Sequence, residues 1–577
     1  ISWIGGPVLR AKMQGAFQVN EALSVGKGRL LGEVIQLKGD ELVAQVYEDT
    51  TGLQPGDLVS GSGRPLSVAV GPGLLGGIFD GLLRPLTGSV GYHVKPGIVQ
   101  RTPGRFAFKP AAEPGAKVAA GGIVGSVDRP RHQSILCPPW LSGRLESIVA
   151  EGEYAEDQVL ATVSPDAGPD EEIRMSHSWP VRKARPVRRR LAPETPMITG
   201  QRILDTLFPV ARGGRAALPG GFGTGKTVLQ EALAKWCDAD VIVYVGCGER
   251  GNEMAEVLNE FPTLSDPRTG HLLAERTVII ANTSNMPVAA REASIYTAIT
   301  VAEYFRDQGL HVALMADSTS RWAEALREVS GRLGELPGES GYPAYLSSRL
   351  AEFYERAARV EGLGGAEGSV TIIGAVSPPA GDFSEPVTLH TKRYARCFWA
   401  LDRQRAQARF YPAIHPLQSY SSDADLLADW WKTAGNPDWQ KQRQRVLELL
   451  EMQVHLERMA RIVGRESLPA QQQLKLVCAG LINDGFLRQS SFSELDRYCS
   501  PKRQVGMLGV LLHFMDRAEA AVESGIEVSR LATLPIRRQL QRLGEVFGAD
   551  VLRRMNQLPR RIDDEFDALE AGKTHAS

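Results

Sequence analysis

The stretch that most constrains this chain is Gly220-Gly-Phe-Gly-Thr-Gly-Lys-Thr227, which has the spacing G-x-x-x-x-G-K-[ST]. Its glycines let backbone N–H groups approach phosphate oxygens, and its lysine brings a positive charge to the β- and γ-phosphates. An apolar strand candidate, residues 215–218, precedes it, and a helix candidate at 228–236 follows with its positive dipole end toward the loop. We predict a nucleoside-triphosphate site that uses Gly220, Gly221, Phe222, Gly223, Thr224, Gly225, Lys226, Thr227 and Val228.

A second feature is a carboxylate at the end of an apolar strand candidate. His311–Ala316 is almost continuously apolar and is followed by Asp317. In proteins with this type of loop, such a carboxylate holds Mg²⁺ together with the loop hydroxyl. We therefore predict a Mg²⁺ site at Thr227 and Asp317.

Hydrolysis also needs a group that orients and polarises the attacking water. The strand candidate Val241–Val245 runs into Gly246-Cys-Gly-Glu-Arg-Gly-Asn-Glu253, and strand C-termini in open α/β sheets face the ligand. Glu249 is the predicted catalytic residue, although chemistry alone favours a structural ion pair equally, and Glu253 is a competitor. Arg250 is predicted to support the phosphates or an interface with a neighbouring subunit.

The hydrophobic pattern divides the 577 residues into regions. Short apolar runs alternate with helix candidates from about 200 to 420, which indicates a doubly wound parallel sheet. Strand-and-turn patterns precede this region, and helical periodicity follows it. We predict a multidomain α/β fold with an N-terminal β-barrel (1–70), an inserted β-rich domain (110–190), an α/β nucleotide-binding domain (71–109 and 191–425) and a C-terminal α-helical bundle (426–577).

The composition excludes several classes of protein. The net charge of −1, from 66 basic and 67 acidic residues, gives no electrostatic reason to expect nucleic acid. The six cysteines show no C-x-x-C pair and are expected to be buried thiols. The sequence shows neither a membrane-span candidate nor a secretory signal, so a cytoplasmic location is expected. The basic run Arg182–Arg190 is expected to be a solvated linker.

Several motifs together resemble those of the catalytic A subunit of V-type and archaeal-type rotary ATPases, over nearly the full length. They are the phosphate loop with Phe222, Gly248-Glu-Arg-Gly-Asn-Glu253, Ser377-Pro-Pro-Ala-Gly-Asp-Phe-Ser-Glu-Pro386, Gly71-Pro-Gly-Leu-Leu75, Phe79-Asp-Gly81 and Leu495-Asp-Arg-Tyr-Cys499. The insert at about 110–190 resembles the bulge domain that separates this type of subunit from the F-type β subunit. The resemblance implies a RecA-like phosphate-loop domain.

The resemblance also implies roles for individual residues. Lys226 and Thr227 would contact phosphate and Mg²⁺, Asp317 the metal shell, and Glu249 the attacking water. Arg250 would lie beside the phosphates or at an interface, and Tyr411, in Phe410-Tyr-Pro412, would pack on adenine. The sequence departs from the family at Gly221, at Thr224 and at Ile414-His-Pro-Leu417, and the last of these lies next to the predicted adenine pocket.

The partners implied are a B subunit in an alternating A3B3 hexamer, central-stalk and peripheral-stalk subunits, and a membrane sector that moves protons or sodium ions. The chain would then lie on the cytoplasmic face of a membrane, bind ATP, ADP and Mg²⁺, and receive an arginine finger from the B subunit. Two alternatives stay open: a structural subunit that holds ATP without hydrolysing it, and a ring-shaped nucleic-acid or protein-export motor. Lys226 together with Glu249 argues against the first, and the insert and neutral charge argue against the second.

Overall fold

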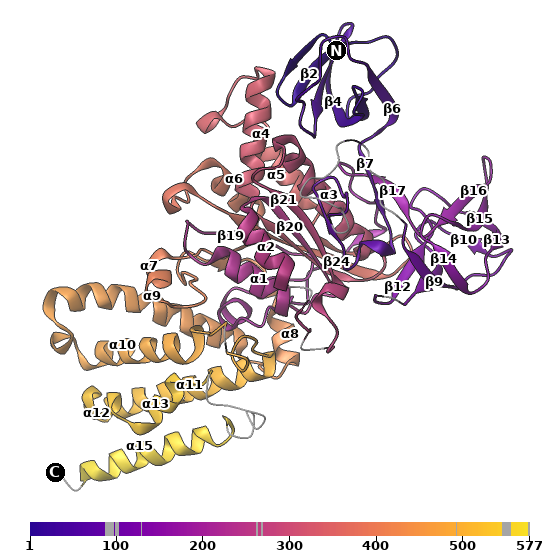
Figure 1. The fold of residues 1–577 in the computed structure, drawn as a ribbon. Coiled ribbons are helices and arrows are strands. Elements are labelled where there is room, and N and C mark those ends of the chain that lie inside the picture. The colour runs from indigo at the N-terminus through magenta and orange to yellow at the C-terminus, as the bar shows by residue number, and fades with distance from the viewer. Residues whose placement is uncertain are drawn as a thin grey trace. The chain divides into compact units, whose positions relative to one another are not determined.

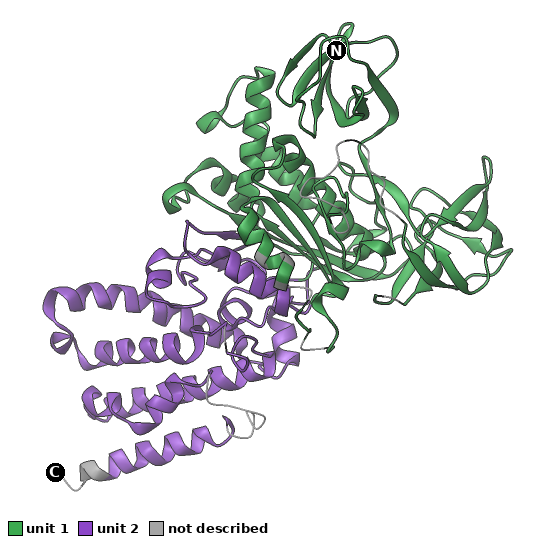
Figure 2. Ribbon diagram, in the orientation of Figure 1, with its two compact units in different colours: residues 1–192, 212–217, 239–395 green, residues 193–211, 218–238, 396–577 purple. Residues whose placement is uncertain are grey.

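The structure is a computed structural model that describes residues 1–86, 97, 103–128, 130–260, 263–266, 269–491, 493–544 and 555–574. Residues 87–96 and 98–102 of the predicted segment 71–109 therefore lie outside the described residues. The chain forms two compact units (Figure 2). Unit 1 comprises residues 1–192, 212–217 and 239–395, and unit 2 comprises residues 193–211, 218–238 and 396–577.

The N-terminal part of unit 1 is the predicted β-barrel. Its antiparallel strands have the order β1-β2-β5-β4-β3-β6 and enclose one apolar cluster that includes Leu9, Leu23, Val34 and Val46 (Figure 1). Side chains of β3 alternate between buried and half-buried, as expected for a strand with one face toward a core. The strands are β1 (Trp3–Gly5), β2 (Val8–Lys12), β3 (Glu21–Val25), β4 (Leu30–Lys38), β5 (Glu41–Val46) and β6 (Val59–Pro65).

The inserted domain of unit 1 consists of two four-stranded antiparallel sheets. Their orders are β10-β13-β15-β16 and β12-β11-β9-β14, and each sheet contributes to an apolar cluster, one around Leu145 and one around Phe108. The strands are β9 (Arg105–Pro110), β10 (Lys117–Val118), β11 (Ile123–Val127), β12 (Gln133–Leu136), β13 (Gly143–Ile148), β14 (Gly152–Ala155), β15 (Val159–Pro165) and β16 (Glu171–Arg174). After it, β17 (His177–Pro180) pairs with β7 (Ser67–Val70).

The third part of unit 1 is a parallel sheet with the strand order β24-β22-β20-β21-β8. The central strands are buried along nearly their whole length, as their continuous apolar sequence predicts. The strands are β8 (Ile78–Phe79), β20 (Val241–Glu249), β21 (Thr277–Thr283), β22 (His311–Asp317) and β24 (Glu367–Val376); β23 (Ala358–Glu361) pairs with β24, and β18 (Arg189–Arg190) with β23.

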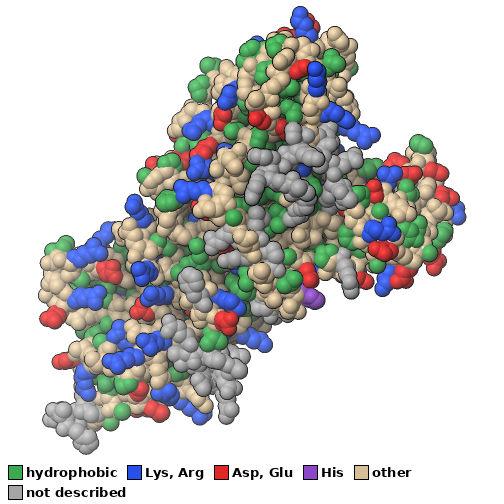
Figure 3. Space-filling model, viewed as in Figure 1, with side chains coloured by type: hydrophobic (Ala, Val, Ile, Leu, Met, Phe, Trp, Pro, Cys, Tyr) green, Lys and Arg blue, Asp and Glu red, His purple; other side chains and the backbone are tan. Residues whose placement is uncertain are grey.

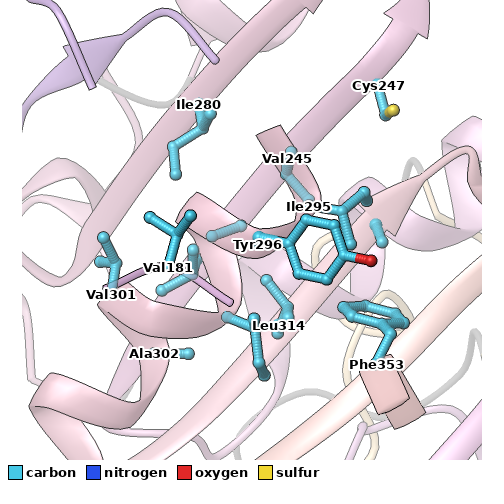
Figure 4. Packing of buried hydrophobic residues seen from close by; sticks show 14 of the residues in the cluster. Val181, Val245, Cys247, Ile280, Ile295, Tyr296, Val301, Ala302, Leu314 and Phe353 are labelled. Atoms are coloured by element: carbon cyan, nitrogen blue, oxygen red, sulfur yellow. The ribbon is translucent and has the colours of Figure 1, made fainter. Parts of the chain in front are cut away.

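Helices cover this sheet. The long helix α3 (Val288–Asp307) packs against β20, β22 and β24, and Figure 4 shows its Ile295 and Tyr296 among the buried side chains of Val245 and Leu314. The other helices of unit 1 are α2 (Gly251–Glu260), α4 (Thr319–Leu333), α5 (Leu346–Glu355) and α6 (Pro386–Tyr394). The predicted doubly wound α/β domain is confirmed.

The solvated-linker prediction for Arg182–Arg190 is wrong for two of its arginines. Arg182 donates to Glu33 of the β-barrel at 2.8 Å and to Glu292 of α3 at 3.1 Å. Arg185 is buried and donates to Asp307 at 2.6 Å. A run of basic residues does not reveal carboxylates supplied by distant elements, and burial of a charge requires such partners.

Unit 2 consists mainly of helices, as predicted for the C-terminal region. Helix α9 packs against α10, α10 against α11, and α11 against α15 (Figure 1). The helices are α1 (Lys226–Trp236), α7 (Arg403–Gln407), α8 (Ala428–Thr433), α9 (Trp439–Val463), α10 (Ala470–Ile482), α11 (Pro501–Glu523), α12 (Val528–Ala532), α13 (Pro535–Gln541) and α15 (Leu558–Thr574). The short strands β25 (Cys397–Phe398) and β26 (Tyr420–Ser421) pair antiparallel, and β19 (Arg215–Pro219) leads into the phosphate loop.

The distribution of charged side chains and the burial of the cysteines agree with the predictions from the sequence. Basic and acidic side chains are interspersed on the face that Figure 3 shows. All six cysteines are buried free thiols. Among the described residues no helix is long and apolar enough to cross a membrane.

Candidate active site

The phosphate loop lies in unit 2 and continues directly into α1. Gly223 and Gly225 have φ values of 75° and 80°, the left-handed region that glycine adopts without strain. A Cβ built on either residue meets no atom of the described residues within 4 Å, so this part of the structure leaves open space above the two glycines. Gly225 is the N-cap of α1 and offers no side chain to bond the first N–H groups of the helix. These features fit a polyphosphate, which backbone N–H groups and the helix dipole would hold.

The other residues of the loop are also arranged as expected for a loop that binds phosphate. The Thr224 hydroxyl donates to the carbonyl of Gly221 at 2.8 Å and thereby closes the turn. The ring of Phe222 is 85% exposed, so it does not belong to the core of this chain. Val228, in the first turn of α1, is also exposed.

A cavity of about 800 Å³ adjoins the loop within unit 2. The loop contributes Gly223, Thr224 and Gly225, and Tyr411 lies in another part of the lining. Burial raises the pKa of the Tyr411 hydroxyl, so this side chain stays a neutral phenol. The remaining lining residues are Val228, Ala406, Arg409, Phe410, Ala413, Asp484, Arg488, Gln489, Ser490, Ser491, Asp496, Gln541, Arg542 and Gly544. The structure thus brings the predicted loop and the predicted adenine-side tyrosine to one cavity.

The other predicted residues lie in unit 1, at the carboxyl ends of adjacent strands. Glu249 is the last residue of β20, and Asp317 is the last residue of β22. These strands are parallel neighbours in which Gly246 pairs with Asp317, so both carboxylates lie at the same edge of the sheet. Asp317 is fully buried and accepts from the Tyr244 hydroxyl at 3.5 Å. Glu249 is half-buried, and its carbonyl accepts from the Ser284 N–H at 2.8 Å.

Two arginines that the sequence analysis did not identify lie beside Glu249. A Cβ on Gly248 would lie 2.7 Å from Arg291 Nε and 2.9 Å from Arg321 Cβ, so both residues pack against this turn. The hydrogen bond to Glu324 raises the pKa of Arg321, and the charges of Glu249 and Glu253 act in the same direction. Arg321 lies in the first turn of α4, four residues after Asp317 at the end of β22, and this proximity in sequence could have identified it.

The thiol of Cys247 is not a candidate nucleophile. It lies on β20 two residues before Glu249, but it is fully buried. Burial raises the pKa of the Cys247 thiol to about 12, so the reactive thiolate is absent at neutral pH. The candidate groups at this edge are therefore the carboxylates and arginines.

Comparison with known proteins identifies the family. The nucleotide-binding-domain model of the ATP synthase alpha/beta family matches residues 200–421. Models of its beta-barrel domain, its barrel-sandwich domain and the C-terminal domain of V and A type ATP synthase match residues 1–63, 101–182 and 428–532. The A subunit of the A-type ATP synthase of Methanopyrus kandleri is 50% identical over 98% of this chain and 97% of its own length. The chain belongs to the ATP synthase alpha/beta family.

Further relatives place it among the A subunits of that family. The corresponding A subunit of the A-type ATP synthase of Thermococcus kodakarensis is 51% identical over 98% of both chains. The V-type ATP synthase alpha chain of Halothermothrix orenii is 49% identical over 99% of this chain and 98% of its own. The ATPase EscN from the type III secretion system of enteropathogenic E. coli has the same fold, with a TM-score of 0.63, 23% identity, and coverage of 89% of this chain and 99% of its own.

Proposed function

We propose that this chain is the catalytic subunit of a V/A-type rotary ATPase and that it hydrolyses and synthesises ATP. The observation that carries the proposal is the cavity in unit 2, because it connects an open phosphate loop to Tyr411. About 800 Å³ lies within the range of small-molecule and cofactor sites. The membership in the A-subunit family supports the same conclusion.

The loop residues bind the nucleotide. Residues Gly220–Val228 hold the phosphates through backbone N–H groups, and Lys226 neutralises the β- and γ-phosphate charge. Tyr411 packs on adenine through the face of its ring. Thr227 and Asp317 offer a hydroxyl and a carboxylate, the hard oxygen donors that Mg²⁺ prefers, and Mg²⁺ would neutralise charge on the phosphates.

The strand-end residues act on the attacking water and the phosphates. Glu249 accepts hydrogen bonds from the water and orients it toward the γ-phosphorus. Arg250, the next residue, stabilises phosphate charge or an interface with the neighbouring subunit. An arginine from a partner subunit then stabilises the charge of the transition state.

The assembly that we propose is an alternating A3B3 ring, with ATP at the A–B interfaces and a rotating central stalk inside. Peripheral stalks and a membrane sector that moves protons or sodium ions complete it, and the chain lies on the cytoplasmic face of the membrane through this complex. We also propose the domain boundaries. The β-barrel comprises residues 1–70, the inserted domain 110–190, the nucleotide-binding domain 71–109 with 191–425, and the helical domain 426–577.

The test is Glu249→Gln in a ring reconstituted from this chain and its B-type partner. We expect the rate of ATP hydrolysis to fall about 10²–10⁴-fold, because the amide is a poor acceptor for a water proton. ATP binding, measured by titration calorimetry, should not change. Glu253→Gln, four residues further along the chain and on α2, is the matched control and should keep its turnover.

Unchanged hydrolysis in the Glu249→Gln ring would refute the catalytic role. A ring that binds ATP but hydrolyses none, even with the native Glu249, would instead identify a structural nucleotide-holding subunit.

A further inference from the structure

Arg202 is a fully buried cation in unit 2 that belongs to no phosphate-binding motif. Its Nε donates to the carbonyl of Phe486 at 2.5 Å, and its Nη2 donates to the carbonyl of Arg488 at 2.5 Å. Its Nη1 donates to the carboxylate of Asp496. The guanidinium therefore uses its planar fork on three acceptors of one part of the chain, the described residues 486–491 and 493–496.

That segment forms one wall of the cavity beside the phosphate loop. Arg488, Gln489, Ser490 and Asp496 all line the cavity, together with Tyr411. Arg202 lies outside the lining and reaches it only through these residues. Its partners, rather than Arg202 itself, are therefore the groups that a bound nucleotide would meet.

Gln489 links the wall to Tyr411. Its Oε1 accepts from the backbone N–H of Arg202 at 2.9 Å, and its Nε2 donates to the carbonyls of Gly200 and Asp496, both at 2.8 Å. Its own N–H donates to the carbonyl of Tyr411 at 2.7 Å. A displacement of Gln489 would therefore move Tyr411 as well.

Asp496 completes the arrangement. Besides the ion pair with Arg202, its Oδ2 accepts from the N–H of Ser490 at 2.8 Å. A fully desolvated ion pair of this kind gives little net stability compared with an apolar pair of the same volume, but it fixes one geometry. The contacts of Arg202 thus determine the shape of the wall.

We propose that Arg202 is a positioning residue for the nucleotide cavity, which holds this wall and, through the bond from Gln489 to the Tyr411 carbonyl, the backbone of Tyr411 in their binding geometry. The inference rests on the proposed function, because it presumes that the cavity takes the nucleoside part of ATP. Arg202 acts through Asp496 and Gln489 and does not itself touch the nucleotide.

The test compares Arg202→Lys and Asp496→Asn with the native full chain. Lysine keeps the charge but loses the planar fork, and asparagine keeps the shape but loses the charge. We expect the Kd for MgATP, measured by titration calorimetry, to rise about 10-fold to 100-fold, since small displacements of positioning groups have effects of this size. In the reconstituted ring KM should rise similarly, and kcat at saturating ATP should stay within about twofold.

The matched control is Arg443→Lys. Arg443 also donates to a backbone carbonyl of unit 2, that of Leu207, at 2.7 Å, but it does not line the cavity. We expect its Kd for MgATP to stay within about twofold of the native value. A purely structural role of Arg202 would lower the thermal midpoint of Arg202→Lys and of Asp496→Asn and leave their Kd for MgATP unchanged.

Folded Arg202→Lys and Asp496→Asn chains that bind MgATP as tightly as the native chain would overturn the inference. If one variant does not fold, the other is judged by the same criterion. A native chain that binds no MgATP would refute the proposed function, and the inference with it. The thermal transition distinguishes that case from an inactive preparation, because only a folded chain unfolds cooperatively.

Discussion

The phosphate loop in unit 2 and the strand ends in unit 1 are two opposite ways of presenting functional groups. The loop is made of consecutive residues, most of which are half-buried or exposed, and Phe222 is 85% exposed. The strand-end groups come from strands that are distant in sequence, and Asp317 is 0% exposed. The geometry of the phosphate loop depends on local backbone conformation, whereas the geometry of the strand ends depends on how helices and strands pack.

This difference predicts different responses to substitution. A change in the loop should alter ligand binding and leave the fold intact, because few side chains pack against it. A change beside the strand ends should alter stability as well, since interiors are closely packed. Each of the following tests addresses this contrast.

The largest expected effect is that of Lys226→Ala on activity. Removal of the cation that neutralises phosphate charge should lower the rate of ATP hydrolysis of the reconstituted ring about 10²–10³-fold. The thermal midpoint of the isolated chain should stay near the native value. Lys235→Ala, near the other end of α1, where Lys235 pairs with Glu231 at 3.6 Å, is the control and should hydrolyse ATP normally.

A loss of stability in Lys226→Ala comparable to its loss of activity would contradict the contrast, because it would make the loop a structural element.

The second test compares Gly248→Ala with Gly225→Ala. Both glycines have positive φ, 73° and 80°, so alanine costs about 1–2 kcal/mol of backbone strain at either residue. At Gly248 the new Cβ also meets Arg291 and Arg321, which adds about 1–3 kcal/mol of overpacking. We expect denaturant unfolding of Gly248→Ala to show the larger loss of stability.

Equal losses at the two glycines would mean that the turn before Glu249 has room to relax. The strand-end region would then be less tightly packed than the structure indicates.

The smallest expected effect concerns pH and uses Asp205, a buried carboxylate of unit 2. It accepts from Thr199, from the N–H of Gly200 at 2.9 Å and from Gln504 at 2.8 Å, but burial dominates and raises the pKa of Asp205 to about 6. The folded chain then binds more protons than the unfolded chain between about pH 4 and 6. The contribution of Asp205 to the free energy of unfolding should fall as pH rises through that window, by at most about 1.4 kcal/mol per pH unit.

The measurement is the thermal midpoint of the native chain and of Asp205→Asn as a function of pH. The native midpoint should fall relative to that of the variant as pH rises to about 6, and level off above it. Asp425→Asn, an exposed carboxylate of the same unit, is the control. If the thermal midpoints of the native chain and of Asp205→Asn depend on pH in the same way, the pKa of Asp205 is not raised.

Much of the fold was predictable because its signals are local. Helix α9 lies in the region where the sequence shows helical periodicity, and β20 and β22 contain the predicted apolar runs Val241–Val245 and His311–Ala316. The phosphate loop was predictable for the same reason: its spacing, its glycines and its flanking strand and helix lie within one short stretch.

The residues that the sequence did not reveal act over long distances. Arg202 meets Asp496 across 294 residues, and no periodicity or spacing connects them. Arg182 and Arg185 stand in a basic run typical of a solvated linker, yet their carboxylate partners lie on other elements. The sequence also did not decide which carboxylate is catalytic. Glu249 and Glu253 lie close together in the chain, and only the exact end of β20 and start of α2 distinguish their positions.

The contact between Arg182 and Glu33 has a consequence for the order in which the chain is made. Glu33 precedes Arg182 in the chain, so its buried carboxylate is synthesised 149 residues before the guanidinium that pairs with it. At ~5–20 residues per second this is a delay of about 7 to 30 seconds. During that time the Tyr47 hydroxyl donates to Glu33 from within the same barrel. We therefore expect the surface around Glu33 to stay hydrated until Arg182 is synthesised, because a polar group that is buried without its partner costs free energy.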